Sequence, residues 1–167
     1  MILQIGDGKF DIDLELTMAY SAAEAAEHCD CAYCRNFYAS VDEKYPNLRP
    51  FLAQFGLDIE APDEMLPFDR PPEMWYENVY SVSGRILSGK EHTFTVDGVE
   101  VWIYSENKLH INQTIPEPHF FIGVGMMALP WVLDEPMRDV VSAANEPSFL
   151  KRMWDRLLSR FEKTDFQ

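Results

Sequence analysis

The stretch Thr93-Phe-Thr-Val-Asp-Gly-Val-Glu-Val-Trp-Ile-Tyr104 decides the fold that this sequence predicts. Apolar and polar residues alternate on both sides of Asp97-Gly98, and a period of two is typical of half-buried strands. An Asp-Gly pair between two such runs predicts a two-residue hairpin turn, because both residues of that turn take a positive φ. The turn fixes the register of the two strands, with Val96 opposite Val99.

Further strands are expected on both sides of this hairpin. Residues 76–87 alternate in the same way, and the run His119–Leu129 is apolar on both faces, which favours a central strand. Residues 109–115 continue the pattern, and the alternation over Phe10–Met18 predicts an N-terminal strand. Together these patterns predict an α+β fold with a mostly antiparallel sheet of about five or six strands.

Helices are expected on one face of that sheet. A capping box at Ser21–Glu24 predicts a short helix that ends near His28. Helical spacing of apolar residues predicts further helices over residues 32–44 and from Asn47 to Gly56. The C-terminal stretch predicts an amphipathic helix that packs on the sheet, with a dimer or partner seam as the alternative. Its apolar residues are Phe149, Leu150, Met153, Trp154, Leu157, Leu158 and Phe161.

The length of 167 residues suits a single domain over residues 1–167. Within it we expect an N-terminal strand and helical part over residues 1–60, a connection rich in proline and acidic residues over 57–74 with room for a short strand near Met65, and the sheet with the C-terminal helix over 75–167. Hydrophobic residues make up 47% and charged residues 25% of the chain, which excludes intrinsically disordered and collagen-like classes.

The chain is acidic, with a formal net charge of −14, and residues 1–136 hold 23 acidic but only 8 basic residues. Such a surface repels phosphate backbones and anionic lipid headgroups, so we expect neither a nucleic acid nor a membrane as partner. It attracts a basic protein partner, although the same charge also keeps a protein soluble without any specific partner.

Several features predict a cytoplasmic protein. The N-terminus has neither the basic region nor the apolar core of a secretory signal. The longest apolar tract, Phe120–Leu133, is interrupted by glycine and proline and is too short to span a bilayer. The three cysteines lie too close together in the sequence for a disulfide framework, which fits a reducing compartment.

The segment His28-Cys29-Asp30-Cys31-Ala32-Tyr33-Cys34 is the candidate metal site. Thiolates and imidazole are the usual zinc ligands, and a Cys-x-x-Cys step can place two sulfurs on one ion when a helix begins between them. Cys31 and Cys34 form this step, and Cys29 and His28 are the further candidate ligands. Because seven consecutive residues wrap a tetrahedron with difficulty, a distant histidine could complete the site; the candidates are His92, His110 and His119.

Two other interpretations of the cysteines remain. They could be reduced thiols at the start of a helix, with Cys34 packed in the core as a small hydrophobic residue. They could also form a redox pair of Cys31 and Cys34, although the strand that precedes such a pair in thioredoxin-like folds is not indicated here.

Other catalytic patterns are not indicated by the sequence. Gly123-Val-Gly125 lies within a predicted strand and opens no helix, so it does not form a phosphate-binding loop. Trp102, Tyr104 and His110 fall on the polar side of the predicted sheet. They are either an exposed surface for a partner or core residues beneath a helix.

The motif Cys31-x-x-Cys34-Arg-Asn36-Phe37 and the later stretches Pro50-Phe51-Leu52 and Phe55-Gly56-Leu57-Asp58 resemble a family of small uncharacterised bacterial proteins. Its members have a Cys-x-Cys-x-x-Cys-x-Asn-Phe segment followed by a Phe-Leu-x-x-x-Gly-hydrophobic-Asp stretch. The likeness covers about residues 29–60. It implies a shared purpose for the cysteines, but neither a substrate nor a mechanism.

Three functions follow as hypotheses. The first is a non-enzymatic protein-binding domain with a structural metal, zinc, at the cysteine cluster. The second is an acidic inhibitor, of the kind that immunity proteins represent, which masks a basic partner such as a nuclease toxin. The third is a metal- or thiol-dependent enzyme that uses Cys31 and Cys34. No residue is assigned a catalytic role.

Overall fold

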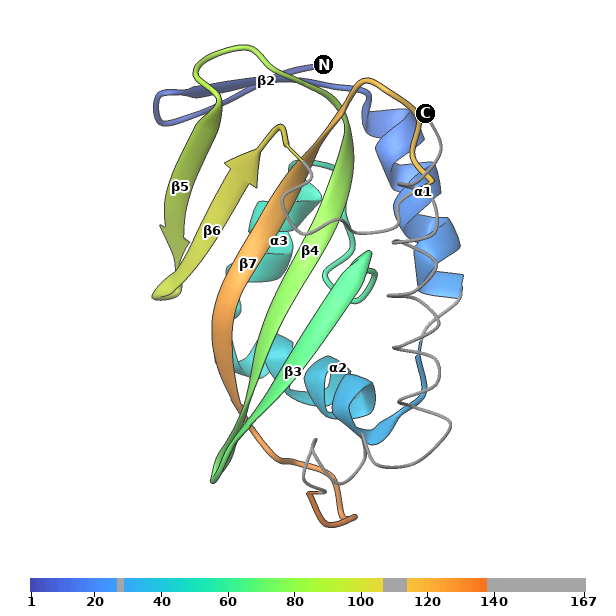
Figure 1. The fold of residues 1–167 in the computed structure, drawn as a ribbon, viewed down its shortest axis with the longest axis vertical. Coiled ribbons are helices and arrows are strands. Elements are labelled where there is room, and N and C mark those ends of the chain that lie inside the picture. The colour runs from blue at the N-terminus through green and yellow to red at the C-terminus, as the bar shows by residue number, and fades with distance from the viewer. Residues whose placement is uncertain (27–28, 107–113, 138–167) are drawn as a thin grey trace, which may run out of the picture. The chain divides into compact units, whose positions relative to one another are not determined.

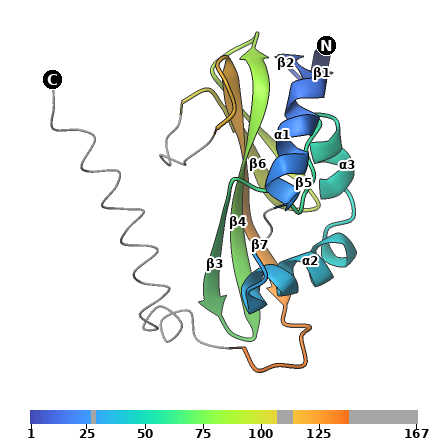
Figure 2. The same ribbon diagram turned by 90° about the vertical axis from the view of Figure 1, so that its right-hand side faces the viewer.

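The computed structural model of the chain describes residues 1–26, 29–106 and 114–137. The chain divides into two units, Met1–Leu133 and Asp134–Gln167, and every element named below belongs to the first. That unit has an α+β fold in which helices lie against one face of a mostly antiparallel sheet (Figures 1 and 2). The predicted fold class is therefore confirmed. In the described part of the chain, no helix has the length and apolar character to cross a membrane.

The sheet has seven strands in the order β1-β2-β4-β7-β6-β5, with β3 paired to β4 outside this path. Their bounds are β1 Ile2–Ile5, β2 Gly8–Ile12, β3 Glu64–Arg70, β4 Glu73–Ile86, β5 Glu91–Val96, β6 Val99–Tyr104 and β7 His119–Pro130. The pairs among these strands are antiparallel. β7 lies between β4 and β6 and is buried over most of its length, so the predicted central strand is confirmed.

The helices are α1 Leu14–Ala26, α2 Ala32–Lys44 and α3 Leu48–Ala53. Figure 2 shows all three on the same side of the sheet. The helix predicted over residues 32–44 agrees with α2 in both bounds. Gly56 follows α3 with a φ of +84°, the left-handed conformation that was predicted to close this helix.

The β5–β6 hairpin confirms its prediction in register and in turn type. Val96 pairs with Val99, and Asp97 and Gly98 have φ values of 50° and 81°. The carboxylate of Asp97 also accepts two hydrogen bonds of 2.7 Å from Asn47, one from its backbone N–H and one from its side-chain amide. The hairpin turn is therefore attached to the start of α3, and the Asn47 side chain does not cap that helix.

The strand predicted over Phe10–Met18 is wrong in its second half. β2 ends at Ile12, and α1 follows almost at once. The change of structure occurs at Asp13, whose carboxylate accepts a hydrogen bond of 3.0 Å from the backbone N–H of Leu16. An aspartate in this position caps a helix N-terminus, and it ends the strand for that reason.

Two further predictions are corrected. Ser21 does not begin a helix, because it lies inside α1, where its buried hydroxyl accepts a hydrogen bond of 3.0 Å from the backbone N–H of Asp58. The short strand expected near Met65 is present as β3, but it occupies much more of the segment 57–74 than expected and pairs with β4 throughout. Pro67 is tolerated in β3 since this strand lies at an edge of the sheet.

The core lies between the helices and the sheet. Aromatic side chains from separate elements meet there: Phe10 of β2 lies 5.5 Å from Phe55 and 5.8 Å from Phe120 of β7, measured between ring centroids. The largest fully buried side chains include Phe10, Phe37, Leu48, Leu52, Phe55, Tyr76, Tyr80 and Phe120. The predicted C-terminal helix, and most of the strand predicted over 109–115, lie outside the described residues.

Candidate metal site

The cysteine cluster stands at the N-terminus of α2. Cys31 is the residue immediately before the helix, in an extended conformation, and Cys34 lies in the first helical turn. The Sγ atoms of Cys29, Cys31 and Cys34 all lie within 4.8 Å of one another. Zn–S bonds of about 2.3 Å place two sulfurs of a tetrahedral site about 3.8 Å apart. The three sulfurs are therefore close enough to hold a metal ion after small rotations of their side chains.

The accessibility of the three sulfurs differs. All three cysteines are free, with Cys29 and Cys31 exposed and Cys34 half-buried. Cys34 is therefore the member of the cluster that lies closest to the protein interior. An ion held here would be exposed to solvent on the side of Cys29 and Cys31. Across residues 1–26, 29–106 and 114–137, this is the one group of three or more cysteine, histidine or acidic side chains with metal-ligand spacing.

Hydrogen bonding between the sulfurs separates their pKa values. The thiol of Cys34 donates a hydrogen bond to Cys31, and this bond is the largest of the contributions that lower the pKa of Cys31. The same interaction, together with burial, raises the pKa of Cys34. Because the thiolate is the form that binds metals and attacks electrophiles, the lowered pKa makes Cys31 the more reactive sulfur of the pair. A metal ion would have to displace the proton of Cys34.

Tyr38 and Tyr76 flank the inner side of the cluster. The hydroxyl of Tyr38 is hydrogen-bonded to Cys34, and the hydroxyl of Tyr76 donates a bond of 3.0 Å to the backbone carbonyl of Tyr33. Burial first, and then the negative charge of nearby cysteines, raises the pKa of Tyr38. Burial likewise raises the pKa of Tyr76. Both phenols therefore stay protonated at neutral pH and can act as donors.

Asn36, two residues after Cys34, attaches α2 to the end of β7. Its side chain is fully buried, and its amide donates hydrogen bonds to the Tyr76 hydroxyl (3.2 Å) and to the Pro130 carbonyl (3.1 Å). The oxygen of the same side-chain amide accepts a hydrogen bond of 2.8 Å from the backbone N–H of Val132. The helix that presents the cysteines is therefore fixed by directional polar contacts. The sequence analysis assigned no role to Asn36, although it belongs to the quoted motif.

The histidines do not complete the site within the described residues. His28 and His110 lie outside them, so their proposed roles as ligands stay predictions. His119 begins β7, whereas α2 contacts the other end of that strand, at Pro130. His92 lies in β5 and packs against the ring of a β2 residue. Neither His92 nor His119 therefore joins the cysteine cluster.

The aromatic residues on the outer sheet face are packed rather than freely exposed. Tyr104 is buried, which raises its pKa to about 12, and its ring stacks on Phe121 at 5.7 Å. Trp102 lies against the backbone of β7: a Cβ atom added at Gly125 would be 2.7 Å from its ring, and one at Gly123 would be 3.2 Å from it. Tyr104 is therefore buried and Trp102 half-buried, whereas His110 lies outside the described residues, so neither interpretation of this face is confirmed.

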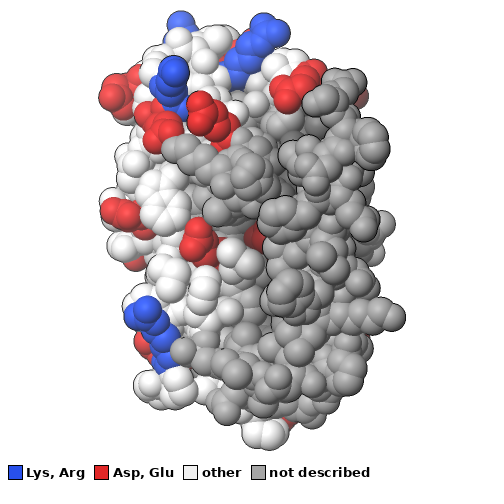
Figure 3. Space-filling view, in the orientation of Figure 1, with Lys and Arg blue, Asp and Glu red and all other residues white. Residues whose placement is uncertain are grey.

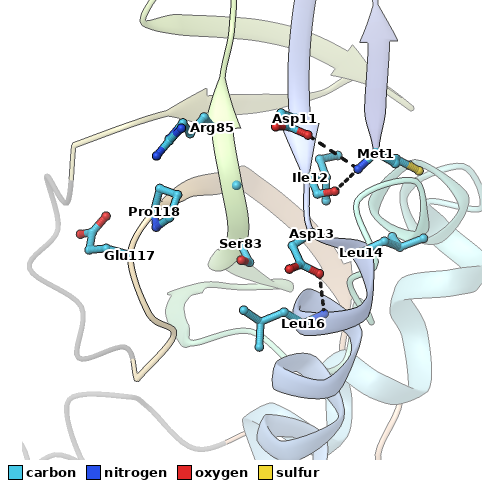
Figure 4. A pocket seen from close by; sticks show the side chains of 11 residues that line it. Met1, Asp11, Ile12, Asp13, Leu14, Leu16, Ser83, Arg85, Glu117 and Pro118 are labelled. Atoms are coloured by element: carbon cyan, nitrogen blue, oxygen red, sulfur yellow. Dashed lines mark hydrogen bonds and ion pairs between the residues drawn. The ribbon is translucent and has the colours of Figure 1, made fainter.

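A separate hollow of about 550 Å³ lies between the end of β2, the start of α1 and β4 (Figure 4). Two of its acidic groups already have partners within the chain. The amine of Met1 contacts the carbonyl of Ile12 and lies 3.7 Å from Asp11, while Asp13 caps α1. These contacts lie at the C-terminal end of β2 and at the start of α1, so these charged groups have a structural role.

Acidic side chains are distributed over the described part of one face of the molecule, with basic side chains at its upper and lower ends (Figure 3). This arrangement differs from a single acidic patch that would match one basic epitope. It therefore gives no preference to the inhibitor hypothesis over general solubility.

Comparison with known proteins adds no relative from which a role could be transferred. No protein-family model, no curated protein and no solved structure matches this chain.

Proposed function

We propose that the protein is a non-enzymatic zinc-binding domain in which one Zn²⁺ is held by the thiolates of Cys29, Cys31 and Cys34. The observation that supports this proposal is the convergence of the three Sγ atoms within 4.8 Å. Three thiolates form a soft ligand set, which favours zinc over the hard cations magnesium and calcium. His28, which directly precedes Cys29 in the sequence, is the proposed fourth ligand.

The proposed zinc has a structural role at the start of α2. Cys31 occupies the N-cap position, yet its side chain makes no capping hydrogen bond to the helix. A zinc ion would join Cys29, which lies outside the helix, to Cys34 inside it, and would thereby fix the first turn in place of a conventional cap. The buried contacts of Asn36 already hold this helix on the sheet, so the ion would stabilise a preformed site.

Metal titration of the purified full chain tests the proposal. We expect one equivalent of Zn²⁺ to bind, and Co²⁺ in its place to give sulfur-to-metal charge-transfer absorption with the strong visible bands of tetrahedral cobalt. Cys29→Ser, Cys31→Ser and Cys34→Ser should each abolish stoichiometric binding. Asp30→Asn, a change between two ligands, is the matched control and should bind like the wild type. If each of the three single serine variants still bound one equivalent of Zn²⁺, the proposed site would be refuted.

The proposed role of His28 as the fourth zinc ligand is tested in the same titration. His28→Ala should weaken zinc binding while leaving the sulfur-to-cobalt absorption in place, because the three thiolates remain. An unchanged zinc affinity would leave the fourth position to water or to a partner.

A second candidate function is dithiol exchange, which the asymmetry of Cys31 and Cys34 favours. Cys31 is exposed at a helix start and has a lowered pKa because Cys34 donates a hydrogen bond to it, whereas Cys34 is half-buried one turn further on. The Cys31 thiolate would attack oxidised glutathione, forming a mixed disulfide and releasing one glutathione thiolate. Cys34 would then lose its proton and displace the second glutathione, leaving a Cys31–Cys34 disulfide. Rapid exchange by zinc-loaded protein would favour this function over a structural metal.

A further inference from the structure

Tyr38 lies beside the metal site without being one of its proposed ligands. It follows Cys34 by four residues on α2, and residues at this spacing share one face of a helix. Side chains on a helix lean toward its N-terminus, so the Tyr38 ring extends toward the turn that contains the sulfurs. Its hydroxyl makes a hydrogen bond with Cys34.

The orientation of Tyr38 is restricted by its surroundings. The side chain is half-buried, and its ring meets the ring of Phe37 edge to face, with centroids 6.0 Å apart. Phe37 is itself fully buried in the core, and the preceding residue, Asn36, holds α2 on the end of β7. The packing of the ring and the attachment of α2 to β7 therefore restrict where the Tyr38 hydroxyl can lie relative to the Cys34 sulfur.

We propose that Tyr38 is a positioning residue of the zinc site, whose hydroxyl donates a hydrogen bond to the Cys34 sulfur and thereby orients that thiolate toward the ion. This inference rests on the proposed function. The bond would restrict the Cys34 side chain to one rotamer and would withdraw part of the negative charge of its sulfur. Groups that hold a metal ligand in this way from outside the coordination sphere commonly change metal affinity about 10- to 100-fold when they are removed.

The direction of the hydrogen bond follows from the chemistry of the two groups. The hydroxyl of a tyrosine carries a proton that it can donate. A zinc-bound thiolate has lost its proton and can only accept. The phenol is therefore the donor of the pair when the metal is bound.

The test compares Tyr38→Phe with Tyr45→Phe in the full chain. Phenylalanine at position 38 keeps the ring and its contact with Phe37, and it removes only the hydroxyl. Tyr45 is a matched control at the C-terminal end of the same helix, where its hydroxyl bonds the backbone of Ala128 at 3.1 Å and 3.0 Å. Zinc affinity is measured by competition with a chromophoric chelator, and the Co²⁺ forms are compared by absorption.

We expect Tyr38→Phe to bind zinc about 10- to 100-fold more weakly than the wild type and to shift the sulfur-to-cobalt charge-transfer band. Tyr45→Phe should lower the thermal unfolding temperature but leave zinc affinity and the cobalt spectrum unchanged. A purely structural role for Tyr38 would not move the charge-transfer band.

Two results would overturn the inference, and they are distinguishable. If the wild type binds zinc and Tyr38→Phe matches it in affinity and in cobalt spectrum, the role of Tyr38 is refuted while the zinc site stands. If the wild type binds no zinc, the proposed function fails and the role of Tyr38 fails with it.

Discussion

Asp63 is a carboxylate whose ionisation the fold opposes. It lies just before β3, and the hydroxyl of Tyr20 on α1 donates a hydrogen bond to one of its oxygens. Burial raises the pKa of Asp63 above its ordinary value of 3.8. A raised pKa means that the folded state favours the protonated form. Its contribution to stability is therefore complete below the ordinary pKa and is lost as the pH rises through the folded-state pKa.

Asp63→Asn should remove this pH dependence, because an amide cannot ionise and its oxygen can still accept the Tyr20 hydrogen bond. We expect the free energy of unfolding of the variant, relative to the wild type, to rise as the pH increases above the ordinary pKa of 3.8 and through the folded-state pKa of Asp63. Urea denaturation at several pH values measures this difference. Ser40→Ala, which removes no ionisable group, is the control and should give a difference that does not change with pH. A flat difference for Asp63→Asn as well would contradict the assignment.

Among the contacts between secondary-structure elements, those of Asn36 connect α2 to the C-terminal end of β7. Asn36→Ala would leave the hydroxyl of Tyr76, the carbonyl of Pro130 and the N–H of Val132 without this partner. Buried polar groups that lose a partner cost about 1 to 3 kcal/mol each, so we expect a loss of about 3 kcal/mol in the free energy of unfolding. Urea denaturation of the metal-free protein measures it.

The control for Asn36→Ala is Ser40→Ala, one turn further along α2. The Ser40 hydroxyl is also buried, but it donates within its own helix, to the carbonyl of Asn36 at 2.6 Å. We expect this change to cost about 1 kcal/mol or less, because it cuts no contact between elements. Equal losses for the two variants would show that Asn36 does not join α2 to β7.

The β5–β6 hairpin could be predicted because its information is local. The turn residues and the alternation that set its register are adjacent in the sequence. The wrong prediction for α1 has the opposite cause. The buried residues of α1 are Thr17 and Ser21, which are polar, so an apolar pattern could not reveal the face that meets the sheet. Their hydroxyls accept hydrogen bonds from the backbone N–H groups of Ser83 (3.1 Å) and Asp58 (3.0 Å).

β3 shows a second limit of prediction from sequence, because a short strand was expected near Met65 but its full extent and its pairing with β4 were not. Its composition differs from that of an ordinary strand, because Pro67 is one of the residues that pair with β4. An edge position tolerates such a residue. The same limit applies to the site. Residue types alone identified Cys29, Cys31 and Cys34, but the contacts of Asn36 join it to residues more than ninety positions away. No local pattern could have revealed that arrangement.

At the scale of the whole molecule, the net charge of −14 bears on association rather than on the fold. The basic protein partner expected from this charge stays a prediction, and its attraction would weaken with added salt. The role of the proposed structural zinc is independent of this charge, because the ion would stabilise the start of α2 and the segment before it. Within the proposal, loss of the metal should therefore loosen the N-terminus of α2 while the sheet and its core remain.

Zinc K-edge X-ray absorption of the zinc-loaded full chain tests the central claim most directly. We predict three sulfur neighbours at about 2.3 Å and one nitrogen or oxygen neighbour at about 2.0 to 2.1 Å. A spectrum with only nitrogen and oxygen neighbours would contradict the claim, since the thiolates of Cys29, Cys31 and Cys34 would then take no part in holding the ion.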